Sequence, residues 1–336
     1  MGVAGLERTV VGRYRLWDCL GHGSHTAVYR ASTSAGEQSA LKVVDVRVQG
    51  GEDLAERLRR DAVVLDRIDH PSILPIRDTI ATRDMTAVAM PFELAPTLQE
   101  LMQQGRLDSD LAWSILSQVE DSLTTAHRSG LACRLLKPAN ILVRDGRAYL
   151  AEFGITGRST GQMALTTPGF RMPDPQYLAP EQVLGEEADH RADVYAFAVL
   201  VFELATGTTL YDDAKPSRVL RRTLNEPPPS AYARNPHIPR EVDRVLRRAL
   251  ARDPERRHPS VAALIAELVD PNGGVDVRHG SPRRSAGVGS DVSRVSPRSR
   301  PPGSETAQAS GGHVLDSLID VLTDVLAREQ RGDDSG

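Results

Sequence analysis

The sequence predicts an α+β fold in which a strand-rich part comes first and a helical part follows. Residues 14–92 alternate apolar and polar positions around glycines, which is the two-residue period of β-strands. From residue 93 to about 270, apolar positions recur at the spacing of helices instead. We therefore expect two lobes, 14–92 and 93–270, after an N-terminal extension over residues 1–13.

The first lobe is expected to hold several strands and one helix. The stretch "YRLWDCLGHGSHTAVYRA" predicts a hairpin, and "SALKVVDV" predicts another strand. In "EDLAERLRRDAVVLDRI" the apolar residues Leu54, Leu58, Val63–Leu65 and Ile68 follow helical spacing. The stretches "PSILPIRDTI" and "MTAVAMPFE" predict further strands.

The second lobe is expected to be built from helices of two kinds. A long amphipathic helix is predicted over "DLAWSILSQVEDSLTTAHRSG", closed by Gly130. The stretch "RADVYAFAVLVFELATG" is apolar almost all round, which is typical of a buried helix. Amphipathic helices are also predicted over "PREVDRVLRRALARD" and "SVAALIAELVD".

Beyond residue 270 the composition changes twice. Residues 271–311 are rich in Ser, Pro, Gly and Arg, so they cannot bury much apolar surface and are predicted to be a disordered linker. Residues 312–330 predict one more amphipathic helix. Two interpretations of this helix remain open, namely docking on the main domain and a coiled-coil contact with a second copy or a partner.

Composition excludes several classes of protein. With a net charge of −4 and only 4% aromatic residues, we expect no nucleic-acid binding. The two cysteines, Cys19 and Cys133, have no paired spacing, which favours a reducing compartment without disulfides or a zinc site. The start of the chain lacks a signal-peptide pattern and no long apolar run predicts a membrane span. The expected location is therefore cytoplasmic.

Several short motifs follow one another in an order that chance does not explain. They are "GHGSHTAV", "ALKVV", "DHPSILP", "CRLLKPANILV", "AEFG", "YLAPEQ", "ADVYAFAVLVFELATG" and "DPERRHP". In this order and spacing the chain resembles the eukaryotic-type Ser/Thr protein kinase family, in its bacterial form, over roughly residues 14 to 268. The resemblance implies a bilobal protein kinase-like fold with ATP as cofactor, together with Mg²⁺ or Mn²⁺.

The resemblance assigns the Gly-rich stretch to the phosphates of ATP. Gly21 and Gly23 would let a β-turn lie close over them. Thr26 stands where the family has a third glycine, and its side chain restricts the approach of the backbone. Val28 would cover the adenine, with Ala40 as its small neighbour. An ordinary hairpin is the simpler alternative for this stretch taken alone.

Lys42 lies in the middle of an apolar run, where an unpaired charge is costly. In the family its partners are ATP phosphates and a glutamate on the following helix. The matching position here is Asp61, which is one methylene shorter, so that a Lys42–Asp61 pair would require the helix to move closer. The alternative is that Asp61 forms only a surface ion pair.

The hinge between the lobes follows the same resemblance. Met90 matches the gatekeeper position, and adenine would bind the C=O of Pro91 and the N–H of Glu93. Pro91 lacks an N–H but keeps its C=O, so it does not break this scheme. Leu142 is the further position assigned to the cofactor. A plain connector between lobes is the alternative.

The catalytic loop departs from the family at its central residue. The family's His-Arg-Asp becomes Cys133-Arg134-Leu135, and the missing Asp would accept the proton of the substrate hydroxyl. Leucine cannot do so, and loss of a positioned acid–base group costs about 10²–10⁴ in rate. Lys137 and Asn140 remain, and in active relatives they contact the γ-phosphate and a metal ion.

The metal motif and the activation segment are altered as well. Asp-Phe-Gly becomes Glu152-Phe153-Gly154, so Asn140 and Glu152 are the implied metal ligands. The longer carboxylate at Glu152 disturbs the near-ideal geometry that Mg²⁺ demands. Asp174 replaces the threonine that touches the catalytic Asp and Lys in the family. Thr166–Thr167 are candidate phosphoacceptors, with ordinary solvated threonines as the alternative.

Scaffold positions match the family better than catalytic ones. Glu181 and Arg257 are expected to form a buried ion pair, and Asp193 is expected to cap the apolar helix and tie the catalytic loop. Intact scaffold with altered acids predicts a pseudokinase that binds ATP and acts as a scaffold or regulatory module. Its protein partner would meet the activation segment or the C-terminal helix, and a homodimer is one form of that contact. The alternative is a slow or atypical Ser/Thr kinase.

Overall fold

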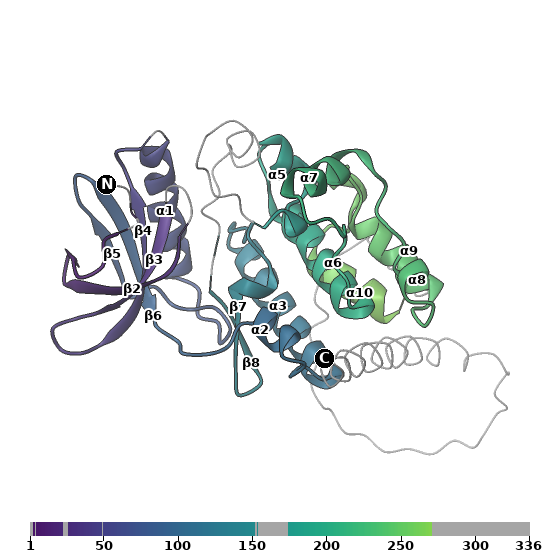
Figure 1. Ribbon diagram of the computed structural model, residues 1–336, viewed down its shortest axis with the longest axis horizontal. Helices are drawn as coiled ribbons and strands as arrows, with labels where there is room; N and C mark the ends of the chain where they lie inside the picture. Colours follow the sequence, from purple (N-terminus) through teal and green to yellow (C-terminus); the bar gives the residue numbers. More distant parts are fainter. Residues whose placement is uncertain are drawn as a thin grey trace, which may run out of the picture.

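The computed structural model describes residues 3, 5–22, 26–48, 50–151, 153 and 174–270. Within them a sheet with one helix forms the first lobe and a group of helices forms the second (Figure 1). The predicted α+β bilobal architecture is therefore confirmed. The linker predicted over residues 271–311 and the helix predicted over residues 312–330 lie outside the described residues.

The first lobe is a six-stranded antiparallel sheet in the order β1-β2-β3-β4-β6-β5. Its β4 strand runs between β3 and β6, at the centre of the sheet, so both of its edges are hydrogen-bonded. The strands are β1 (Val10–Val11), β2 (Tyr14–His22), β3 (Thr26–Ser32), β4 (Gln38–Asp45), β5 (Asp78–Ala81) and β6 (Met85–Pro91).

One face of this sheet is closed by the N-terminal extension. Val3 is 3% exposed, and its carbonyl accepts a hydrogen bond of 2.5 Å from the phenol of Tyr29. Tyr29 belongs to a buried cluster with Val11 and Leu41, and β1 pairs directly with β2. The segment before residue 14 is thus part of the lobe's core rather than a separate appendage.

Helix α1 (Gly51–Leu65) packs on the other face of the sheet. Its first residue has no room for a side chain, because a Cβ on Gly51 would lie 2.1 Å from the carbonyl oxygen of Asp45. Leu54 and Leu58 are buried in the same cluster as Val88 of β6. Val63, which the sequence pattern placed on the apolar face, is instead 54% exposed, so that part of the prediction is wrong.

The second lobe consists of helices and one small hairpin. Its helices are α2 (Leu98–Gln103), α3 (Ser109–Arg128), α5 (Pro180–Leu184), α6 (His190–Thr206), α7 (Pro216–Asn225), α8 (Ala231–Arg234), α9 (Arg240–Ala249) and α10 (Val261–Val269), with single 3₁₀ turns at Pro138–Asn140, Pro175–Tyr177 and Pro254–Arg256. The hairpin β7 (Ile141–Arg144) and β8 (Arg147–Leu150) was not predicted, because each strand has only four residues.

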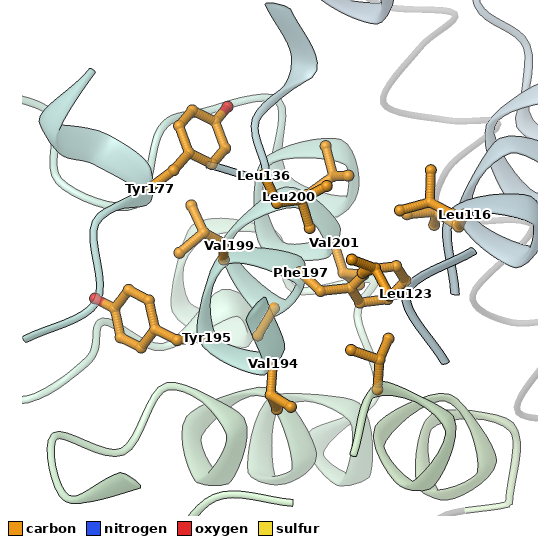
Figure 2. Close-up of a cluster of buried hydrophobic side chains, with 14 of the residues drawn as sticks. Leu116, Leu123, Leu136, Tyr177, Val194, Tyr195, Phe197, Val199, Leu200 and Val201 are labelled. Atoms are coloured by element: carbon orange, nitrogen blue, oxygen red, sulfur yellow. The ribbon is translucent and has the colours of Figure 1, made fainter. Parts of the chain in front are cut away.

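Helix α6 is the centre of the second lobe, as its apolar sequence predicted. Phe197 and Phe202 are fully buried, and Figure 2 shows Phe197 directed toward Leu123 of α3 while Tyr195 lies on another side of the helix. Burying one such side chain contributes about 1.5–3 kcal/mol. No helix in the described ranges is both long and apolar enough to cross a membrane.

Candidate active site

Strand β4 determines the face on which the predicted nucleotide residues lie. Lys42 pairs with Val28 on β3 and with Val88 on β6, and Ala40 pairs with Met90. Paired residues, and residues two apart on one strand, share a face of a sheet, so these side chains all lie on the same face. Val28, Ala40 and Met90 are half-buried, which leaves this part of the face accessible.

The Gly-rich stretch is only partly described. Gly21 is exposed near the end of β2, opposite Val28, and the pairing of β2 with β3 shifts register on both sides of Cys19. Such irregularities bend a strand and let it leave the sheet. Thr26 is the first residue of β3. Gly23 lies outside the described residues.

Lys42 and Asp61 line one small cavity without being joined. The cavity has a volume of about 20 Å³, room for roughly one water molecule. Within the described part of the chain no ion pair links Lys42 to Asp61, and Asp61 Oδ2 is buried without a hydrogen-bond partner. Burial raises the pKa of the Asp61 carboxyl, while positive charges including Arg134 act in the opposite direction. The two side chains therefore meet at one cavity without an ion pair between them.

The hinge has an ion pair beside it. Met90 and Pro91 end strand β6, and the carboxylate of Glu93 accepts a hydrogen bond from Arg144 at the end of β7. The pair connects the hinge to the hairpin of the second lobe. Among the described residues no hydrogen bond uses the N–H of Glu93. Leu142 lies in β7 and forms an isolated bridge with Thr97, the N-cap of α2.

The catalytic loop is fixed to α6 by one carboxylate. Asp193 is fully buried, and its two oxygens accept hydrogen bonds from the N–H groups of Cys133 (2.7 Å) and Arg134 (2.6 Å). His127 of α3 lies 2.7 Å from the same carboxylate. These bonds hold Arg134 at a φ of 60°, a left-handed conformation that a residue with a side chain rarely adopts.

The predicted role of Asp193 is therefore confirmed in one part and wrong in the other. It ties the loop, but the cap of α6 is Asp189, whose side chain accepts a hydrogen bond from the N–H of Arg191. The reason is position, because Asp193 lies within the first turn and points toward the catalytic loop. A capping residue must precede the first turn.

The loop keeps its shape although its acid is absent. Asn140 Nδ2 donates to the carbonyl oxygen of Leu135 over 2.8 Å, and the carbonyl of Asn140 accepts from the N–H of Ala151. Cys133, which stands for the family's histidine, is 1% exposed and packs in the main core. Leu135 is half-buried and offers only an aliphatic side chain where the carboxylate is expected.

A larger cavity opens between the catalytic loop, α2 and α6. Its volume is about 160 Å³, and Lys137, Asp174, Tyr177 and Glu203 bring their polar groups to its wall. The phenol of Tyr177 donates to the carboxylate of Glu203, and burial together with that negative charge raises the pKa of Tyr177. The phenol therefore stays protonated at neutral pH. Asp174 Oδ1 accepts a hydrogen bond of 3.1 Å from the N–H of Gln176.

Sequence reasoning missed Tyr177 and Glu203 as members of the site. A usable signal was present, because Glu203 is an acid near the end of a helix that is otherwise almost entirely apolar. A partly buried acid of this kind needs a hydrogen-bond donor, and Tyr177 supplies it. His127 was also missed, since a histidine at the end of an amphipathic helix gives no sign of a partner 66 residues away.

Some predicted residues have no described placement. Glu152, the second of the implied metal ligands beside Asn140, lies outside the described residues. So does the activation segment from 154 to 173, with Thr166–Thr167. In the described ranges no group of three or more His, Cys, Asp or Glu side chains forms a metal cluster.

Comparison with known proteins agrees with this geometry. Residues 14–268 match the model of the protein kinase domain family. The chain is 32% identical over 270 residues to a probable serine/threonine-protein kinase of Streptomyces coelicolor, covering 78% of this chain and 40% of that protein. It is 34% identical over 259 residues to serine/threonine-protein kinase Pkn1 of Myxococcus xanthus, covering 75% and 37%.

Among solved structures, the kinase domain of PknI from Mycobacterium tuberculosis superimposes with a TM-score of 0.60 at 26% identity. The match covers 79% of this chain and 98% of that domain. The chain spans about two fifths of the length of the curated relatives named above. Fold, motif order and family match agree, and the chain belongs to the protein kinase family, related to the bacterial Ser/Thr kinases.

Proposed function

We propose that this chain binds ATP and acts chiefly as a pseudokinase, a scaffold or regulatory module in bacterial signalling. The observation that carries the proposal is Leu135. The loop around it keeps its hydrogen bonds to Asp193 and Asn140, so the leucine stands in a correctly shaped loop at the position of the proton acceptor. A loop without these hydrogen bonds would indicate that the whole site had lost its function along with the acid. Because the hydrogen bonds are present, the leucine at position 135 favours a site that still binds a ligand.

Nucleotide binding is supported by the accessible face of the first lobe. Val28, Ala40 and Met90 offer an apolar surface for adenine, and the N–H of Glu93 is a donor at the hinge. A kinase domain implies ATP binding in general. The apolar wall with one or two placed backbone groups is the usual character of a cofactor site.

The use of lysine also supports a site for phosphates. The chain has three lysines among 41 basic residues, at positions 42, 137 and 215. Lys42 and Lys137 both line cavities at the proposed site, and Lys215 is exposed on the far part of the second lobe. A lysine ammonium is a compact point charge suited to a phosphate, and arginine serves nearly everywhere else in this chain.

A divalent metal fits the site only in part. The nitrogen of the Asn140 amide is used by Leu135, so its oxygen is the atom that the side chain can offer to Mg²⁺ or Mn²⁺. Glu152 would supply the carboxylate. A bound metal would neutralise phosphate charge, and Asn140 and Glu152 are the residues that would hold it.

A slow Ser/Thr kinase is the second candidate. Phosphoryl transfer depends mostly on positioning and charge stabilisation, and Lys42, Lys137 and Asn140 remain in place for both. On this view the missing acid at Leu135 lowers the rate by about 10²–10⁴ without abolishing transfer.

Two measurements on the whole chain test the proposal. A thermal-shift titration with ATP, with and without Mg²⁺ or Mn²⁺, should show stabilisation that Lys42→Ala removes and Lys215→Ala preserves. Incubation with labelled ATP and generic protein substrates should show little incorporation. Absence of any thermal shift would leave a structural scaffold only, and incorporation at rates of ordinary kinases would overturn the pseudokinase proposal.

The partner is proposed to meet the activation segment or the C-terminal helix, with self-association as one form of that contact. Deleting residues 312–336 tests the helix, because a dimer that depends on it should lose half of its solution mass. An unchanged mass would exclude the helix as the dimer element.

A further inference from the structure

The cavity beside the catalytic loop holds a carboxylate that the proposed function does not use. Asp174 and Lys137 of the catalytic loop both line this space of about 160 Å³. The two are not joined as an ion pair within the described part of the chain. The volume of the cavity that both line is sufficient for a small group, such as the hydroxymethyl of a serine side chain.

Asp174 has one oxygen free for such a group. Its Oδ1 accepts a hydrogen bond from the N–H of Gln176, and no hydrogen bond between described residues uses Oδ2. The other acids nearby in the described ranges are engaged or line another cavity. Glu203 binds Tyr177, Asp193 holds the catalytic loop, and Asp61 lines the separate cavity with Lys42.

The position of Asp174 is also well fixed. It precedes a 3₁₀ turn that starts with Pro175, and the side chain of Gln176 donates to the carbonyl of Tyr211 over 2.9 Å. Tyr177 at the end of the turn is anchored by Glu203 of α6. A carboxylate useful in proton transfer must be held in this way, because misplacement by about 1 Å can cost on the order of 100-fold in rate.

From this arrangement we propose that Asp174 takes the role that Leu135 cannot fill in whatever phosphotransfer the chain retains. The inference rests on the ATP binding proposed above. A substrate hydroxyl lies between Lys137 and Asp174, and its oxygen forms a bond to the γ-phosphorus of ATP. The bond from that phosphorus to the β,γ-bridging oxygen breaks, ADP leaves, and the hydroxyl proton passes to Asp174 Oδ2.

On this proposal, the aspartate at position 174 compensates for the leucine at position 135. The family places its acid on the catalytic loop and a threonine opposite, whereas this chain places leucine on the loop and the acid opposite. One carboxylate remains near Lys137 in both arrangements. The relocated carboxylate would approach the hydroxyl from the turn at 175–177 instead of from the catalytic loop.

Four forms of the full chain test this assignment with labelled ATP, Mn²⁺ and a generic Ser/Thr substrate. They are the wild type, Asp174→Asn, Leu135→Asp and the double variant. Asparagine keeps the oxygen that caps Gln176 but cannot accept a proton, so we expect Asp174→Asn to lose residual transfer by about 100-fold. In the double variant the acid at position 135 should restore transfer to at least the wild-type rate.

Asp174→Glu should keep part of the activity, because a carboxylate is retained. The matched control is Asp110→Asn, the same change at an exposed position at the start of α3, which should leave transfer unaltered. Melting temperature and the ATP thermal shift, measured on every form, separate loss of transfer from loss of folding or binding.

Two outcomes would overturn the inference. Wild-type incorporation no higher than that of Lys42→Ala would mean that no transfer exists for Asp174 to support. Equal rates for wild type and Asp174→Asn would mean that the carboxylate takes no part. In both cases an ATP-induced thermal shift would leave the proposed nucleotide binding standing, so failure of the inference and failure of the proposed function are distinct.

Discussion

Each terminal nitrogen of the Arg257 guanidinium lies 2.7 Å from a different carboxylate oxygen of Glu181. The arginine side chain is fully buried, and it also donates to the carbonyls of Ala251, Arg191 and Arg252. The pair, which the sequence predicted, connects α5 to the loop before α10. Because every donor is satisfied, the charge is tolerated inside the lobe only while all these partners remain.

Removing this arginine should strongly destabilise the protein. Arg257→Ala leaves Glu181 buried and unpaired, which costs about 3–5 kcal/mol. Chemical denaturation monitored by circular dichroism measures the change. The matched control is Arg256→Ala, one position earlier, where the side chain is 81% exposed and its ion pair with Asp253 is long. Equal losses for the two variants would contradict a buried, specific role for the pair.

Lengthening the acid of α1 should strengthen ATP binding. Asp61→Glu adds the methylene that Asp61 lacks, so the carboxylate can reach Lys42 within the small cavity that both line. An ion pair between Lys42 and the longer acid would orient the ammonium toward the phosphates. We expect a gain in ATP affinity of about 5- to 10-fold, which corresponds to the ~1 kcal/mol of one additional ion pair. Isothermal titration with ATP measures it, and an affinity equal to or lower than wild type would show that the helix cannot present the longer acid.

Neutralising Asp61 should stabilise the nucleotide-free protein. Burial raises the pKa of Asp61 in the folded state, so the folded protein binds this proton more tightly than the unfolded chain. Stability is therefore lost as the pH rises from the unfolded pKa through the folded pKa. Asp61→Asn removes this loss and should gain about 1 kcal/mol at neutral pH, because Oδ2 is no longer a buried charge without a partner.

The gain should disappear in acid, where the wild-type carboxyl is protonated in both states. Urea denaturation at several pH values measures the stability difference between Asp61→Asn and wild type, both in acid and at neutral pH. Asp66→Asn, an exposed aspartate just after α1, is the control and should show no such pH-dependent gain. A constant difference between Asp61→Asn and wild type at all pH values would count against the buried carboxylate as its cause.

Removing the Asp193 carboxylate, which holds the catalytic loop, should destabilise the protein more than removing the Asp189 carboxylate, which caps α6. Asp193→Ala removes the acceptor for two backbone N–H groups and the contact with His127. Asp189→Ala removes a helix cap and a half-exposed ion pair with Arg191. We expect a loss of about 3 kcal/mol or more at Asp193 and about 1 kcal/mol at Asp189. Hydrogen exchange should also show faster opening of the N–H groups of Cys133 and Arg134 in the first variant. Similar losses in both would contradict this ranking.

Much of the fold could be predicted because its signals are local. The apolar run of α6 and the alternation along β4 each depend on neighbouring residues, and both elements formed where the pattern placed them. Val63 did not follow its pattern, because α1 contacts a sheet on only one side and the helix face it covers is narrower than the apolar stripe. Short strands such as β7 carry too few residues for a period to be seen.

Site residues that belong to a sequence motif could be predicted from the spacing of that motif. Contacts between segments far apart in the sequence could not. Lys42 and Asn140 followed from motif spacing. The contact of Tyr177 with Glu203 spans 26 residues, and the separation of Lys42 from Asp61 depends on how closely α1 approaches the sheet. Asp174 and Lys137 likewise come to line one cavity only when the turn at 175–177 packs against α6.

Because the chain has only three lysines, amine-directed labelling can be followed separately at each of them. An amine-directed acylating reagent has three side-chain targets, of which Lys42 is 5% exposed and Lys137 is half-buried, while Lys215 lies open to solvent. Labelling of Lys215 thus serves as an internal standard on every molecule. Peptide mass spectrometry of the ratio between sites would report occupancy of the cleft directly, even in a mixture of proteins and without any turnover.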